Sequence, residues 1–122
     1  MIELSDEQFQ ECIDLAFDKL PLKHRDNVKN VAILYQDEPS EEQRRVLALR
    51  HDQTLLGLYE GIPLSQRQGM QPVLPDKITL FKLPLTSMAQ SKQDLQQEIY
   101  HTLWHEIAHY YGLDHPQIHA LE

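Results

Sequence analysis

His105, Glu106 and His109 form the pattern His-Glu-x-x-His near the C-terminal end of the sequence. If this segment is helical, residues four apart lie on one face, one turn apart. Two imidazoles placed in this way can bind the same Zn²⁺ ion at about 2.0–2.1 Å. Glu106 lies about 100° around such a helix from His105. Its carboxylate is then free to act as general base on a metal-activated water that attacks a carbonyl.

A third metal ligand is needed, because catalytic zinc usually keeps three protein ligands and one open position. The longer pattern H-E-x-x-H-x-x-G-x-x-H, which ends at His115, supplies one and is of the metzincin type. Gly112 allows the chain to turn sharply after the helix, because a positive φ costs glycine little. We therefore predict His105, His109 and His115 as ligands of one zinc ion per chain. Asp114 and His119 are the alternatives to His115.

The other residues of this segment are given structural roles. His101 lies one turn before His105 on the same face, and we expect it to line a cleft rather than bind metal. Trp104, Ile107 and Ala108 fall on the remaining faces of the helix and are predicted to be core.

The elements that position the motif can be predicted from capping signals and hydrophobic spacing. A capping box formed by Ser5 and Gln8 opens an amphipathic helix that Pro21 ends. Ser91 and Asp94 give a second start signal, for the helix that carries the motif. Ser40 is consistent with either a short helix or a long connection. The apolar runs Val31–Tyr35, Leu55–Tyr59 and Lys77–Leu83 predict strands, and Ser65–Pro75 predicts an exposed loop.

Together these elements predict an α+β fold: a compact single domain, residues 1–122, with a small three-stranded sheet packed against an N-terminal helix and a C-terminal metal-binding helix. The formal net charge of −8 argues against nucleic acid as a partner. The lone cysteine, Cys12, excludes an intramolecular disulfide and favours the cytoplasm. Its place on the apolar stripe of the first helix predicts a core residue. No apolar run approaches the length of a membrane span, and we expect a monomer.

The chain resembles the small bacterial zincin-like metallopeptidases, also described as minimal metalloproteases. Three blocks carry the resemblance: LLGLYEGIPL at 55–64, DKITLFKLPL at 76–85, and HEIAHYYGLDH at 105–115. The resemblance implies a zincin-like fold in which His105 and His109 bind metal and Glu106 is the catalytic carboxylate. Many members have aspartate where this chain has His115. Larger metzincins carry a methionine turn after the third histidine, but all three methionines here precede the motif.

Two functions of different classes are consistent with these features. The first is a zinc-dependent peptidase that acts on a peptide or protein substrate lying extended along an edge strand. The second is a metal-binding interaction module without turnover, which the small size of the chain favours, because a short chain has little wall from which to build a deep cleft.

Overall fold

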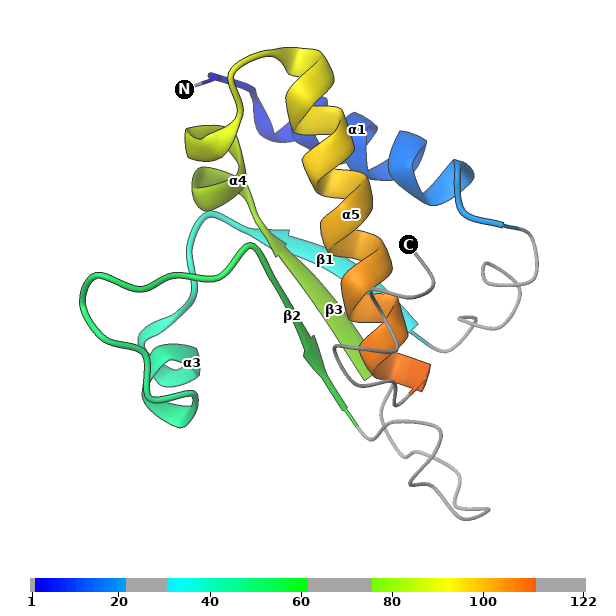
Figure 1. The fold of residues 1–122 in the computed structure, drawn as a ribbon. Coiled ribbons are helices and arrows are strands. Elements are labelled where there is room, and N and C mark those ends of the chain that lie inside the picture. The colour runs from blue at the N-terminus through cyan, green and yellow to red at the C-terminus, as the bar shows by residue number, and fades with distance from the viewer. Residues whose placement is uncertain (1, 22–30, 62–75, 112–122) are drawn as a thin grey trace.

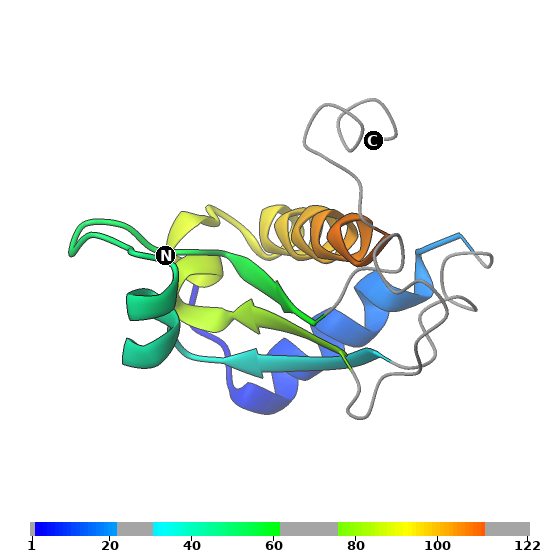
Figure 2. The ribbon, with the colours of Figure 1, turned by 90° about the horizontal axis from the view of Figure 1, so that it is seen from below.

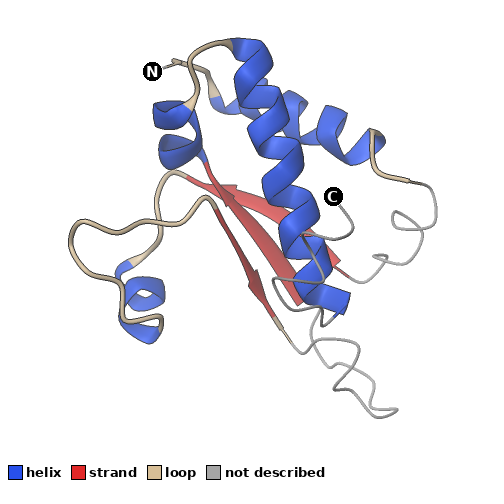
Figure 3. Cartoon of the chain, in the orientation of Figure 1, coloured by secondary structure: helices blue, strands red, loops and turns tan. Residues whose placement is uncertain are grey.

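A computed structural model describes residues 2–21, 31–61 and 76–111 of the chain. Figures 1 and 3 show a small sheet with a long helix beside it. The helices are α1 (Asp6–Asp18), α3 (Glu41–Val46), α4 (Lys82–Met88) and α5 (Lys92–Tyr111), and the strands are β1 (Val31–Gln36), β2 (Gly57–Glu60) and β3 (Asp76–Phe81). The α+β class is confirmed. The loop predicted for Ser65–Pro75 and the residues Gly112, Asp114, His115 and His119 lie outside the described residues.

The sheet has three strands, the number predicted from the sequence, in the order β1-β3-β2. The central strand β3 is parallel to β1, with Ile33 opposite Ile78. It is antiparallel to β2, with Tyr59 opposite the same Ile78. Strand β2 is therefore an edge strand, and its outer side faces away from β3.

Helices α1 and α5 pack on one face of the sheet and enclose the core. Figure 2 shows α5 running along one side of the sheet, with α3 beyond one end. Phe9 of α1 meets Tyr35 of β1 edge to face, with ring centroids 5.7 Å apart. The side-chain amide of Gln96 on α5 donates a 2.8 Å hydrogen bond to the carbonyl of Cys12 on α1. Cys12 is buried, as predicted. Among the described residues, no helix is long and apolar enough to cross a membrane.

The predicted helix starts are confirmed by their caps. The Gln8 main-chain N–H donates to the Ser5 hydroxyl at 3.1 Å, and the Ser5 N–H donates to the Gln8 side chain at 2.9 Å. Ser40 and Gln43 form the same reciprocal pair at the start of α3. Of the two alternatives for this segment, the short helix is therefore the observed one. The Asp94 N–H donates to the Ser91 hydroxyl at 3.0 Å at the start of α5.

The predicted strand Lys77–Leu83 was wrong at its C-terminal end. Strand β3 stops at Phe81, and the next two residues begin α4, a helix that the sequence did not predict. Pro84 is the third residue of this helix, where the missing N–H costs nothing because the first turn has no internal partner for it. Contacts with distant segments hold this turn: Lys82 pairs with Asp6 at 2.9 Å, and the Leu83 N–H donates to the carbonyl of Asp37 at 3.0 Å.

Candidate metal centre

Helix α5 brings His105, Glu106 and His109 together, as the spacing predicted. One possible ligand atom from each residue lies within 4.8 Å of the others. The two imidazole rings have centroids 4.8 Å apart and planes inclined at 74°. Both histidine side chains are half-buried rather than enclosed. Two imidazole nitrogens this close together suit Zn²⁺, and the carboxylate beside them is available as a base, so the chemistry of these side chains fits the metal.

The buried face of α5 determines where the histidines lie. Leu95, Ile99, Leu103 and Ile107 recur every four residues and are all 0% exposed. They pack that side of the helix against the core, and His105 and His109 lie outside this buried stripe. Trp104, Ile107 and Ala108 are buried as the sequence predicted. The candidate metal-binding pair is therefore carried by a well-packed helix.

Glu106 is the one carboxylic acid of the cluster, and burial perturbs its pKa. Its side chain is 8% exposed. Burial raises its pKa to about 7, and a hydrogen bond from the main-chain N–H of Tyr59 acts in the opposite direction. A carboxyl with a pKa near neutrality can both accept and release a proton at physiological pH.

The hydrogen-bonding pattern of β2 explains how Tyr59 reaches Glu106. The Phe81 N–H of β3 donates to the carbonyl of Leu56 at 2.9 Å. In an antiparallel pair, residues that bond the neighbouring strand alternate with residues that do not. By that alternation and the observed register, Leu58 bonds β3, whereas the main-chain groups of Gly57 and Tyr59 point to the outer edge. There the Glu106 carboxylate accepts a hydrogen bond from the Tyr59 N–H.

The Tyr59 side chain is anchored at two further points. Its hydroxyl donates a 2.7 Å hydrogen bond to Asp76, whose side chain is 4% exposed. Its ring packs edge to face against Tyr110 of α5, with centroids 6.1 Å apart. One residue of the edge strand is thereby connected to the first residue of β3, to α5 and to the acid of the candidate site.

A cleft of about 330 Å³ opens beside the cluster, between α5 and the segment that leads into β2. His101 lies in its wall, as predicted. Its full lining is Leu55, Leu56, Gly57, Glu98, His101, Thr102, His105 and Glu106. The volume is within the range of small ligand sites, and two of the three cluster residues open into it.

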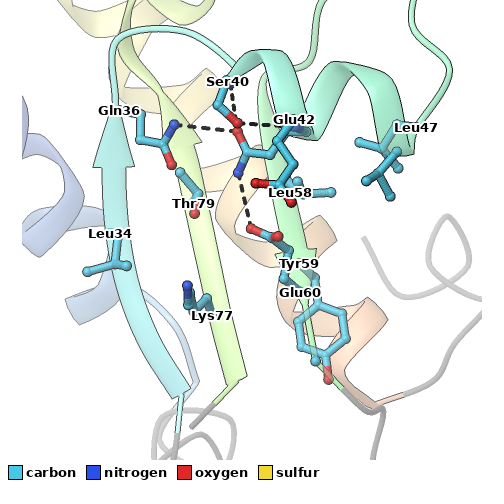
Figure 4. A pocket seen from close by; sticks show the side chains of 13 residues that line it. Leu34, Gln36, Ser40, Glu42, Leu47, Leu58, Tyr59, Glu60, Lys77 and Thr79 are labelled. Atoms are coloured by element: carbon cyan, nitrogen blue, oxygen red, sulfur yellow. Dashed lines mark hydrogen bonds between the residues drawn. The ribbon is translucent and has the colours of Figure 1, made fainter. Parts of the chain in front are cut away.

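A larger groove of about 580 Å³ lies on the opposite face of the sheet, beneath α3 (Figure 4). Gln43 spans it, donating to Glu60 at 3.1 Å and accepting from Gln36 at 3.4 Å. Glu42 and Glu60 line this groove without any histidine. Within the described ranges, the only group of three side chains that could hold a metal ion is the one on α5.

Sequence reasoning found the three residues of α5 but missed Tyr59, Gly57 and Asp76. The only signal for these came from two blocks of resemblance: residues 55–64 include Gly57 and Tyr59, and residues 76–85 begin with Asp76. The predicted third ligand, His115, and its alternatives Asp114 and His119 lie beyond the last described residue, so their place relative to the cluster stays a prediction.

Comparison with known proteins bears on the fold and the family of the chain. In the search of curated proteins, no match was found. Among solved structures, a conserved hypothetical protein from Thermus thermophilus superposes with a TM-score of 0.58 at 18% sequence identity, covering 88% of this chain and 94% of that one. At this identity the likeness concerns the fold alone. A family profile described as zincin-like metallopeptidase matches residues 28–122, which is most of the sequence. The chain therefore belongs to the zincin-like metallopeptidase family.

Proposed function

We propose that this protein is a zinc-dependent peptidase that hydrolyses peptide bonds, with Glu106 as general base. The observation that carries the proposal is the cluster of His105, Glu106 and His109, of which His105 and Glu106 line the 330 Å³ cleft. Family membership supports it at the level of the fold and the metal. We propose a peptide or protein as the substrate.

His105 and His109 would hold the zinc ion through ring nitrogens, and His115 would complete the set, with Asp114 and His119 as the alternatives. When bound, zinc lowers the pKa of a water molecule and polarises a carbonyl oxygen. Glu106, whose pKa burial raises to about 7 in the metal-free chain, would accept the proton of the attacking water and pass it to the leaving amine. Its low exposure keeps bulk water from competing for that proton.

The edge of β2 supports an extended substrate. Gly57 directs its main-chain groups to the outer edge, next to the cleft, whereas the Tyr59 N–H is already used by Glu106. A peptide adding to this edge would therefore pair with the segment Leu55–Gly57 and run along α5 past His101. In that position its carbonyls pass close to the candidate metal ligands.

The experiment that tests the proposal combines metal content with cleavage. Wild type, Glu106→Ala and His105→Ala are analysed by mass spectrometry for zinc and then incubated with a broad peptide library. We expect about one zinc per chain in wild type and Glu106→Ala, much less in His105→Ala, and cleavage by wild type alone. Glu11→Gln, an exposed change on α1, is the matched control and should cleave like wild type.

Two results would contradict the proposal. A Glu106→Ala variant that cleaves as fast as wild type would show that Glu106 is not the general base. If wild type and Glu106→Ala bind zinc equally and neither cleaves any peptide, the result would favour the alternative function, a metal-binding interaction module. Parallel variants of His115, Asp114 and His119 identify the third ligand as the one whose loss empties the site.

A further inference from the structure

Gly57 lies at a close approach between β2 and α5. A Cβ atom at this position would come within 2.7 Å of the Thr102 Cγ2 methyl carbon, and within 3.3 Å of both Glu106 Cγ and Leu80 Cδ2. Contacts under 3.0 Å are not tolerated by real Cβ atoms, so one of the partners would have to move. The glycine is needed for space and not for its backbone angles, because the positive-φ glycine among the described residues is Gly61.

Thr102 has little freedom to move aside. Its side chain is 8% exposed and lies on α5, whose neighbouring Leu103 is fully buried. A β-branched side chain in a helix has few accessible χ1 rotamers. A side chain added at Gly57 would therefore displace β2, the edge strand, rather than the helix.

The spacing set at Gly57 determines a contact two residues further along the strand. Both Gly57 and Tyr59 direct their main-chain groups to the outer edge, and there the Tyr59 N–H donates to the Glu106 carboxylate. A hydrogen bond is lost once the donor–acceptor distance grows well beyond about 3.2 Å, and it weakens steeply once the angle at the hydrogen falls below about 120°. A shift of β2 at Gly57 would therefore weaken the hydrogen bond between the Tyr59 N–H and the Glu106 carboxylate.

We propose that Gly57 is a positioning residue: its missing side chain sets the distance between β2 and α5 at which the Tyr59 N–H holds the Glu106 carboxylate in place. The catalytic consequence rests on the proposed peptidase function, but the positioning itself does not. The Tyr59 side chain holds the other end of the strand in place, through its hydrogen bond to Asp76 and its ring contact with Tyr110.

The test is a compensating pair of substitutions read by NMR on the zinc-free chain. Gly57→Ala should move the Tyr59 amide proton upfield as far as Glu106→Ala does, because both remove the same hydrogen bond. Adding Thr102→Ser to Gly57→Ala deletes the methyl group that the new Cβ would strike and should return the amide toward its wild-type shift. Thr102→Ser alone completes the cycle. Ala16→Val, which overpacks the fully buried position 16 on α1, controls for general loss of stability and should leave the Tyr59 amide unchanged.

Zinc content and kinetics extend the test to the active chain. Gly57→Ala should keep its zinc while kcat falls by about a hundredfold, the scale expected for an ångström of misplacement. The double variant should recover most of that loss. If wild type cleaves no peptide, the peptidase proposal fails while the amide shifts still decide the role of Gly57.

Several outcomes would overturn the inference. A Tyr59 amide that is the same in wild type and Glu106→Ala would show that the hydrogen bond is not made, and this comparison needs no variant at Gly57. A Gly57→Ala protein whose Tyr59 amide stays at the wild-type shift would show that side chains, and not the strand, absorb the added methyl group. A double variant as perturbed as Gly57→Ala would rule out the contact with Thr102 as the cause.

Discussion

The hydroxyl of Tyr59 donates a 2.7 Å hydrogen bond to the carboxylate of Asp76, and the main-chain N–H of the same tyrosine donates to Glu106. Asp76 is the first residue of the central strand and Tyr59 belongs to the edge strand. One residue thus couples the packing of the sheet to the acid on α5. The candidate site is supported from the sheet side as well as from its own helix.

Tyr59→Phe removes only the hydroxyl and should destabilise the fold by about 2 kcal/mol, the scale of a hydrogen bond to a charged group. The loss is that large because Asp76 is 4% exposed, so water cannot fully replace the lost donor. Urea denaturation measures the change in free energy of unfolding. Tyr100→Phe, a half-buried tyrosine on α5, is the control and should cost under about 0.5 kcal/mol. Equal effects of the two variants would mean that the contact with Asp76 contributes nothing.

Glu106→Gln should stabilise the zinc-free chain, and more so as the pH rises. The folded-state pKa of Glu106 is raised from 4.5 to about 7, so the folded chain binds the extra proton between these values. Stability contributed by this group is therefore lost as the pH rises through that window. The gain from Glu106→Gln should be about 2 kcal/mol larger at pH 8 than at pH 5. Urea denaturation in the presence of a chelator measures both values, and a gain independent of pH would exclude the raised pKa.

Features encoded by neighbouring residues were predictable from the sequence. The capping boxes at Ser5 and Ser40 and the helical spacing of His105 and His109 depend on residues three or four apart. Such patterns need no knowledge of the remaining fold. The predicted helices and the core position of Cys12 follow from the same local spacing.

Features created by distant contacts were not predictable. Helix α4 continues an alternating pattern that favoured a strand, and it is held by contacts of Lys82 and Leu83 with segments far away in sequence. The roles of Gly57 and Tyr59 depend on how closely β2 lies against α5. The distance between β2 and α5 cannot be predicted from hydrophobic periodicity or composition. A glycine in a predicted strand indicates at most that another segment approaches closely.

Cys12 should react slowly with thiol reagents in the native chain. Cys12 is 2% exposed, and burial raises the pKa of its thiol; Lys92 lowers that pKa and Glu11 raises it. The reactive thiolate is therefore scarce and inaccessible until the chain opens. Reaction with a chromogenic disulfide at pH 8 should be at least about a hundredfold faster in 6 M guanidinium chloride than in buffer. Comparable rates would show that α1 does not shield Cys12.

Zinc should raise the thermal stability of wild type through the side chains of α5. A ligand that binds only the folded chain stabilises it by about 2.7 kcal/mol at a hundredfold excess over Kd. His109→Ala removes one of two imidazoles whose rings lie 4.8 Å apart, so this variant should show little or no increase in Tm. His51→Ala is the matched control, because His51 is exposed and precedes β2, and it should respond to zinc like wild type. Scanning calorimetry with and without zinc at pH 7.5 makes the comparison. An undiminished increase in His109→Ala would mean that zinc binds elsewhere on the chain, and it would remove the metal from the mechanism built on Glu106.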